Sequence, residues 1–258
     1  MLLTQSELNI QIKALGMKSG DTVCLHSSLS SLGYILGGAQ TVIRALLEIL
    51  GEQGTLVMPA FSPHVSDPQL WSDKHIGEND LEKARKEVPC FDIRTTPTTM
   101  GVIPEVFRNW PRTIRSEHPQ VSVCANGRLA EYIISPHEME WGEGKGSPFE
   151  RLYELDAKVL ALGVGFNRIT LLHYAESLVP QGRRKQRKIP MKVNDFRSWQ
   201  LVNDVGDDLD THFPIIGERF VLDDMVTSKI IGNAHCSYMS SKELVDYAVN
   251  YFQDIFSD

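Results

Sequence analysis

A histidine and a glutamate stand three residues apart in the segment LGVGFNRITLLHYAE, residues 162–176. The segment predicts a helix over 170–178 with His173 and Glu176 on one face. An imidazole beside a carboxylate can work as a general base, because the carboxylate orients the ring and stabilises the imidazolium that forms. Structural pairs show the same spacing, so the two residues alone leave catalysis and packing both open. Zinc binding is disfavoured, because no HExxH or similar ligand set accompanies the pair.

Hydroxyl side chains gather in two other segments. HSSLSS, at 26–31, directly follows a predicted strand, and ligands of open α/β sheets bind beyond the carboxyl ends of strands. A serine-rich turn without a ligand is the plainer interpretation, and no GxSxG elbow supports a serine hydrolase. TTPTTMG, at 95–101, leads into a predicted helix whose free N–H groups attract anions. An N-cap by Thr98 or Thr99 explains that segment equally well.

Two polar segments complete the set of candidates. In RSEHP, residues 115–119, Arg115 suits a phosphate and His118 suits a second acid or base, while a structural salt bridge fits the same residues. GKGSP, residues 144–148, is a glycine loop that lacks the P-loop pattern. No GxGxxG dinucleotide fingerprint is present in the sequence.

Glycine-punctuated apolar segments predict the elements that position these residues. Strands over 22–26 and 55–58 flank a helix that starts after Gly37 and Gly38, and this βαβ order is typical of a parallel sheet. Elsewhere in the sequence, the apolar pattern predicts a buried strand over 158–163 and helices over 4–15, 101–110, 127–134 and 240–255.

Two regions depart from this regular pattern. Residues 62–98 form an irregular, proline-containing insertion with a charged segment at 78–87 that predicts a surface helix. In the tail, a basic block at 183–192 precedes an acidic block at 203–224. These blocks are interpreted either as solvated faces or as the surroundings of an anionic cofactor and a cationic substrate.

The composition is that of a globular chain. The chain has 258 residues, 42% hydrophobic and 23% charged, with a formal net charge of −7. These values exclude collagen-like and wholly disordered classes, and the acidic balance argues against a general nucleic-acid binder. Four scattered cysteines without a CxxC pair, no signal peptide at the start and no membrane-length apolar run together predict a cytoplasmic protein.

Taken together, the segments resemble the aminoglycoside 3-N-acetyltransferase family. The resemblance rests on ordered blocks between residues 20 and 176, with 183–252 looking like the variable end of that family. The blocks are HSSLSSLGYILGGAQTVIRALLEILGEQGTLVMPAFS, TTPTTMGVIPEVF, RSEHPQVSVCANG, GSPFERL and VLALGVGFNRITLLHYAE. The resemblance implies a single α/β domain over 1–258, with a central mixed β-sheet flanked by helices.

The resemblance also implies a reaction and its residues. Acetyl-CoA would acetylate the 3-amino group of the 2-deoxystreptamine ring of an aminoglycoside, giving antibiotic resistance, with no metal involved. His173 becomes the expected general base and Glu176 its partner. The expected cofactor contacts are His26, Ser27, Ser28, Leu29, Thr99, Arg115 and Ser116.

The acceptor side is expected to be acidic, because aminoglycosides are polycations. The insertion at 62–98 and the tail at 183–225 are expected to shape it, through Asp67, Trp71, Asp73 and Asp210. The alternatives are the same CoA-dependent N-acylation of another amine, such as an amino sugar or nucleoside, and a binding protein without catalysis. No nucleic-acid or membrane partner is expected, and the chain is expected to be a monomer or homodimer.

Overall fold

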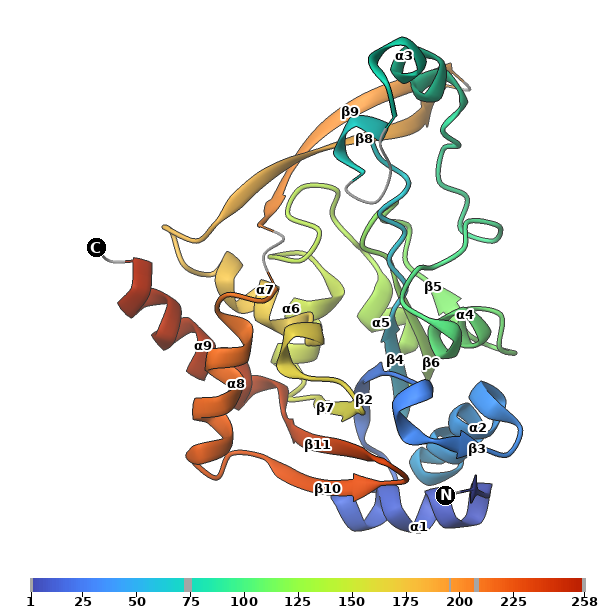
Figure 1. Cartoon of the computed structure of the whole chain (residues 1–258), viewed down its shortest axis with the longest axis vertical. Coiled ribbons are helices and arrows are strands. Elements are labelled where there is room, and N and C mark those ends of the chain that lie inside the picture. The colour runs from blue at the N-terminus through green and yellow to red at the C-terminus, as the bar shows by residue number, and fades with distance from the viewer. Residues whose placement is uncertain (1, 72–75, 195, 207–208, 257–258) are drawn as a thin grey trace.

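A mixed sheet lies at the centre of the computed structural model, which describes residues 2–71, 76–194, 196–206 and 209–256 (Figure 1). Its strand order is β10-β11-β7-β2-β4-β6-β5. The parallel pairs are β2 with β4 and β2 with β7, and the other neighbours are antiparallel. The strands are β2 (Thr22–Ser27), β4 (Thr55–Pro59), β5 (Ile114–Arg115), β6 (Val123–Gly127), β7 (Lys158–Leu162), β10 (Thr227–Ile231) and β11 (Ala234–Ser240).

Helices cover both faces of this sheet (Figure 1). Alternate residues of β2 point to opposite sides, so Val23 and Leu25 join one apolar core and Cys24 joins the other. The first core is completed by α1 (Gln5–Leu15), α2 (Gly38–Leu50) and α4 (Val102–Arg108). The second is completed by α5 (Ala130–Ile134), α6 (Pro148–Glu154), α7 (Leu171–Ser177), α8 (Phe213–Leu222) and α9 (Ser241–Phe256). The predicted α/β fold with a central mixed sheet is confirmed.

Local sequence signals located their elements well. Thr4 and Glu7 form the capping box that starts α1, and Gly16 ends the helix. The predicted surface helix of the insertion is α3 (Glu78–Glu87). The sequence did not predict the small parallel pair of β1 (Leu2–Leu3) with β3 (Tyr34–Ile35). It also did not predict most of the structure after residue 180.

The tail and the insertion form one substructure. After α7 the chain runs into a long antiparallel hairpin of β8 (Arg184–Val193) and β9 (Phe196–Val205), which reaches toward α3 (Figure 1). Val65 of the insertion packs with Ile189 and Val202 of the hairpin in a small apolar cluster. The Asp67 N–H donates to the Lys188 carbonyl at 3.0 Å, which ties the two segments together.

A buried histidine supports the loop between α5 and α6. His118 is 0% exposed, and its Nδ1 accepts the backbone N–H groups of Gln120 (3.3 Å) and Val121 (3.1 Å). Its Nε2 then donates to the Met139 carbonyl at 3.3 Å. Burial and the positive charge of Arg187 lower the pKa of His118 to about 4. His118 therefore holds the loop as a neutral ring, a structural role rather than that of a second acid or base.

A second histidine of that loop stacks on the first. The rings of His118 and His137 lie 4.8 Å apart. His137 Nε2 donates to the Gly142 carbonyl at 2.7 Å, and its Nδ1 accepts the Ser116 hydroxyl at 2.8 Å. Burial, together with the neighbouring His118, lowers the pKa of His137 to about 3. Both histidines therefore stay neutral at pH values well below 6.5, which is about the pKa of a histidine in the unfolded chain.

This pair predicts how stability depends on pH. Between about pH 6.5 and 4 the unfolded chain binds protons at these histidines and the folded chain does not, so the free energy of unfolding falls as pH falls. We expect His118 to contribute on the order of 1–3 kcal/mol to that loss. Urea unfolding at several pH values measures the free energy of unfolding in this window. That free energy should change less steeply with pH in His118→Gln than in wild type. Equal slopes would contradict the account.

Candidate active site

Two adjoining cavities open at the carboxyl end of β2. They measure about 350 and 550 Å³, and Ser27, Ser28 and Gly101 line both. Leu29 lines the larger one, while His26 and Thr99 line the smaller one. Five of the seven predicted cofactor residues are therefore brought together at one strand end, where α/β sheets bind ligands.

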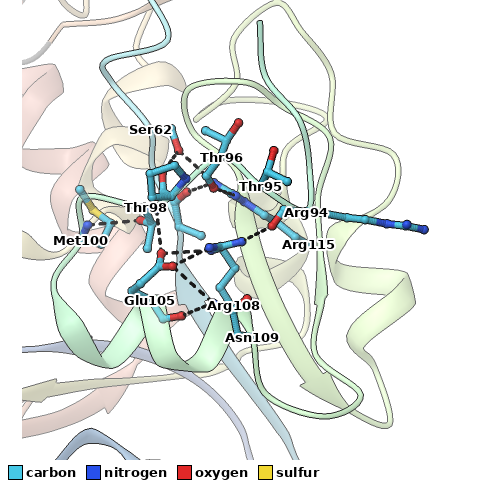
Figure 2. A network of polar contacts seen from close by, with 12 residues as sticks. Ser62, Arg94, Thr95, Thr96, Thr98, Met100, Glu105, Arg108, Asn109 and Arg115 are labelled. Carbon is cyan, nitrogen blue, oxygen red and sulfur yellow. Dashed lines mark hydrogen bonds and ion pairs between the residues drawn. The ribbon is translucent and has the colours of Figure 1, made fainter. Parts of the chain in front are cut away.

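The wall formed by 95–101 is held by a polar network (Figure 2). Glu105 of α4 accepts the Thr98 N–H at 2.9 Å and the Arg108 Nε–H at 3.0 Å. The Thr98 hydroxyl donates to the Phe61 carbonyl at 2.9 Å. These bonds fix the turn against the end of β4, so that Thr99 and Gly101 face the cavities.

Arg115 is part of this support and not of the cavity surface. Its side chain is buried and donates to the Thr96 carbonyl at 2.6 Å (Figure 2). It also donates to the Ala60 carbonyl at 2.7 Å and to the Ser122 hydroxyl at 2.9 Å. A guanidinium that donates to these oxygens joins three segments of the chain, which is a structural role. A cofactor contact at Arg115 stays a prediction.

Ser116 is likewise held by contacts inside the protein, and its predicted cofactor contact stays a prediction. It is 2% exposed, donates to His137 and accepts the Val123 N–H at 2.8 Å. The hydroxyl therefore both donates and accepts a hydrogen bond inside the protein.

His173 lies one helical turn beyond the inner end of the smaller cavity. Thr170 lines that cavity, and its carbonyl accepts the His173 N–H at 2.9 Å. The imidazole is 5% exposed and packs edge-on against Phe213, with ring centroids 4.8 Å apart. His173 Nε2 lies 3.9 Å from Oε1 of Glu143, a carboxylate that is itself 2% exposed. A titratable ring thus sits beside a buried carboxylate, close to a cavity.

The contacts of Glu176 differ from the expectation. Its carboxylate is 0% exposed and accepts the backbone N–H of Arg183 (2.9 Å), the Nε–H (2.7 Å) and an Nη2–H (2.9 Å). The partner described for the Glu176 carboxylate is thus Arg183, and its pairing with His173 stays a prediction. A guanidinium satisfies a buried carboxylate in two-pronged geometry better than an imidazole does.

Glu143 is absent from the predicted residues. It lies just before the glycine loop at 144–148, between Gly142 and Gly144. The sequence showed only an acidic residue in a glycine-rich loop, which is weak evidence for a functional residue. Its pairing partner, Arg187, is 44 residues away in sequence, so the pair has no local pattern.

The basic block turns out to hold carboxylates. Arg187 Nη2 donates to Glu143 at 3.0 Å, and the same guanidinium pairs with Asp204 of the acidic block. Arg183 holds Glu176 in the same way. These arginines form ion pairs within the protein. Such pairs favour neither solvated faces nor ligand surroundings as the interpretation of the two blocks as a whole.

The predicted acceptor residues are dispersed. Asp67 is 3% exposed and pairs with Arg85 and Lys188; burial raises its pKa, but these hydrogen bonds outweigh burial and hold the pKa below its usual value. Its charge is therefore balanced by Arg85 of the insertion and Lys188 of the hairpin. Trp71 donates from Nε1 to Ser66 at 3.0 Å within the same segment.

The other two acceptor residues have different outcomes. Asp73 lies outside the described residues. Asp210 is exposed and accepts a hydrogen bond from Asn167 at 2.8 Å, beside Arg168, which lines the smaller cavity. A role of Asp210 in acceptor binding stays a prediction.

Within the described ranges, no group of three or more His, Cys, Asp or Glu side chains is placed to hold a metal ion. In the same ranges, no helix has the length and apolar character needed to cross a membrane.

The chain is similar in sequence and fold to known proteins. The chain is 36% identical to the SPbeta prophage-derived aminoglycoside N(3')-acetyltransferase-like protein YokD of Bacillus subtilis (strain 168), over 96% of this chain and 92% of that protein. The crystal structure of YokD superposes with a TM-score of 0.95 at 35% identity, covering 100% of this chain and 96% of that one. The chain is also 31% identical to aminoglycoside N(3)-acetyltransferase III of Salmonella sp., over 98% and 92% of the two chains.

A ligand complex also has this fold. The binary complex of AAC-IIIb with CoASH matches with a TM-score of 0.87 at 28% identity, covering 99% of this chain and 98% of that chain. The sequence model of the family described as Aminoglycoside 3-N-acetyltransferase matches residues 24–253. The predicted family and class of enzyme are confirmed, as is acetyl-CoA as the co-substrate of that class. The chain belongs to the aminoglycoside 3-N-acetyltransferase family.

Proposed function

We propose that this chain transfers the acetyl group of acetyl-CoA to the 3-amino group of the 2-deoxystreptamine ring of an aminoglycoside, with His173 as general base. One observation carries the proposal. The cavity at the end of β2 extends to Thr170, and the helix that starts there presents His173 one turn later. A thioester in the cavity and a base beside it are the parts that acyl transfer to an amine needs.

The chemistry follows from the state of the acceptor. An aminoglycoside amine arrives as an ammonium ion, which has no lone pair for attack. His173 takes one proton, and the free amine attacks the acetyl carbonyl carbon. A second proton leaves the nitrogen once the C–N bond has formed, and the C–S bond then breaks. The CoA thiolate takes up one proton and the solvent receives the other.

Ser27 is suited to stabilise the oxyanion of this step. Its Oγ is buried at the end of β2 and has no hydrogen-bond partner in the described part of the chain. Ser27 lines both cavities, so this donor lies beside the space proposed for the thioester. A preorganised donor stabilises the charge that develops in the transition state more than the neutral ground state.

The setting proposed for this reaction is the cytoplasm. All four cysteines are free thiols, which is typical of a reducing compartment. Acetylation there would remove a positive charge from the antibiotic and so give resistance.

The acceptor is tested directly by CoA-thiol release. We expect purified protein to release CoA from acetyl-CoA with aminoglycosides that carry a free 3-amino group, and not with analogues in which that amine is blocked. A thiol reagent follows the reaction. Release with a different amine, such as an amino sugar, and with no aminoglycoside would move the function to the alternative acceptor.

The role of His173 is tested by substitution. His173→Ala should lower kcat roughly 100-fold or more, the usual loss for a general base. Acetyl-CoA affinity in calorimetry should stay near wild type, because the ring lies beyond the cavity lining. A variant with wild-type kcat would remove His173 from the mechanism.

The cofactor cavity is tested by filling it. Ser28 lines both cavities, so Ser28→Phe should raise the Kd for acetyl-CoA by about tenfold or more, equivalent to 1.4 kcal/mol. Ser228→Phe places the same ring at an exposed position of β10 and should leave that Kd unchanged. Equal affinities for the two variants would place the cofactor elsewhere.

A further inference from the structure

Glu143 makes a contact that becomes favourable only during the reaction. Its Oε1 lies 3.9 Å from His173 Nε2, which is too long for a direct hydrogen bond but within ion-pair range. A neutral ring gains little from a carboxylate at that distance, whereas an imidazolium gains a charge interaction in a buried setting. The contact therefore favours the state in which His173 has taken the proton of the acceptor.

The carboxylate is held so that one oxygen faces the ring. Arg187 donates to Oε2 of Glu143 at 3.0 Å, whereas His173 lies near the other oxygen, Oε1. Arg187 is itself fixed by Asp204 and by Gln120, whose Oε1 accepts at 3.3 Å. A buried carboxylate requires such a partner, and this one also sets its orientation.

The backbone that carries Glu143 is fixed as well. His137 donates to the Gly142 carbonyl at 2.7 Å, and the Trp141 N–H donates to Asn203 of β9 at 2.8 Å. A Cβ on Gly142 would lie 2.5 Å from His118 Nε2, so the loop passes too close for any other residue. Support of this kind is what a side chain with a precise position requires.

We propose that Glu143, rather than Glu176, is the positioning residue that stabilises the His173 imidazolium during acetyl transfer. The proposal rests on the proposed function for the reaction it serves. When a proton passes from the acceptor nitrogen to His173, Glu143 balances the new charge until the proton is released. Glu176 shares the helix with His173, but three hydrogen bonds from Arg183 already occupy its carboxylate.

Three variants separate this role from a structural one. Glu143→Gln keeps the shape and the Arg187 bond but removes the charge, so kcat should fall about tenfold or more with both KM values near wild type. Glu143→Asp keeps the charge and should restore much of kcat. Glu140→Gln removes the same charge from an exposed position of the same loop and should leave kcat unchanged.

A spectroscopic measurement decides the contact without turnover. In protein with ¹⁵N-labelled histidines, the titration midpoint of His173 should be lower in Glu143→Gln than in wild type, because the carboxylate favours the charged ring. The other charges on this side of the ring are the pairs Glu176–Arg183 and Arg187–Asp204, and both remain in the variant.

The outcomes separate this proposal from the proposed function. If wild type acetylates no aminoglycoside, the proposed function fails, and the His173 midpoint alone then decides whether Glu143 acts on the ring. An unmoved midpoint overturns the proposal. Wild-type kcat in Glu143→Gln overturns it too, as does a larger kcat loss in Glu176→Gln than in Glu143→Gln.

Discussion

The burial of two carboxylates determines how the tail must fold. Glu143 and Glu176 are 2% and 0% exposed, and a charge taken out of water is tolerated only with a partner and hydrogen bonds. Arg187 and Arg183 supply both. One arginine stands within β8 and the other just before it, so the hairpin has to dock on α7 and on the loop before α6. Only then does His173 acquire the surroundings that its proposed chemistry requires.

The two sides of the site differ in how they are built. On the cofactor side, the cavities are lined mainly by hydroxyl groups, glycines and apolar side chains from the end of β2 and the turn at 95–101. Arg115 fixes that turn from behind, through backbone carbonyls. On the side of His173, charged pairs between distant segments provide the rigidity.

Sequence patterns predicted what depends on neighbours along the chain. The capping box of α1, the βαβ unit around α2 and the hydroxyl run after β2 are local signals, and each lies where it was expected. Pairings between distant residues were not predictable in this way. Arg115 resembled a phosphate ligand in the sequence because the carbonyls that it contacts come from other segments. Glu143 was not predicted because its ion-pair partner, Arg187, is distant in the sequence. The strands β8 and β9 carry charges on both faces, which hides the alternation that marks a strand.

A crystal structure of this chain with CoA bound tests the central claim most directly, because it locates the thiol relative to the base. The account predicts that the pantetheine arm passes between Ser27 and Gly101 and that the sulfur lies at the Thr170 end of the cavity, facing α7 and His173. CoA bound in this cavity with its sulfur turned away from α7 would contradict His173 as the base. CoA bound elsewhere on the chain would contradict the assignment of the cavity itself.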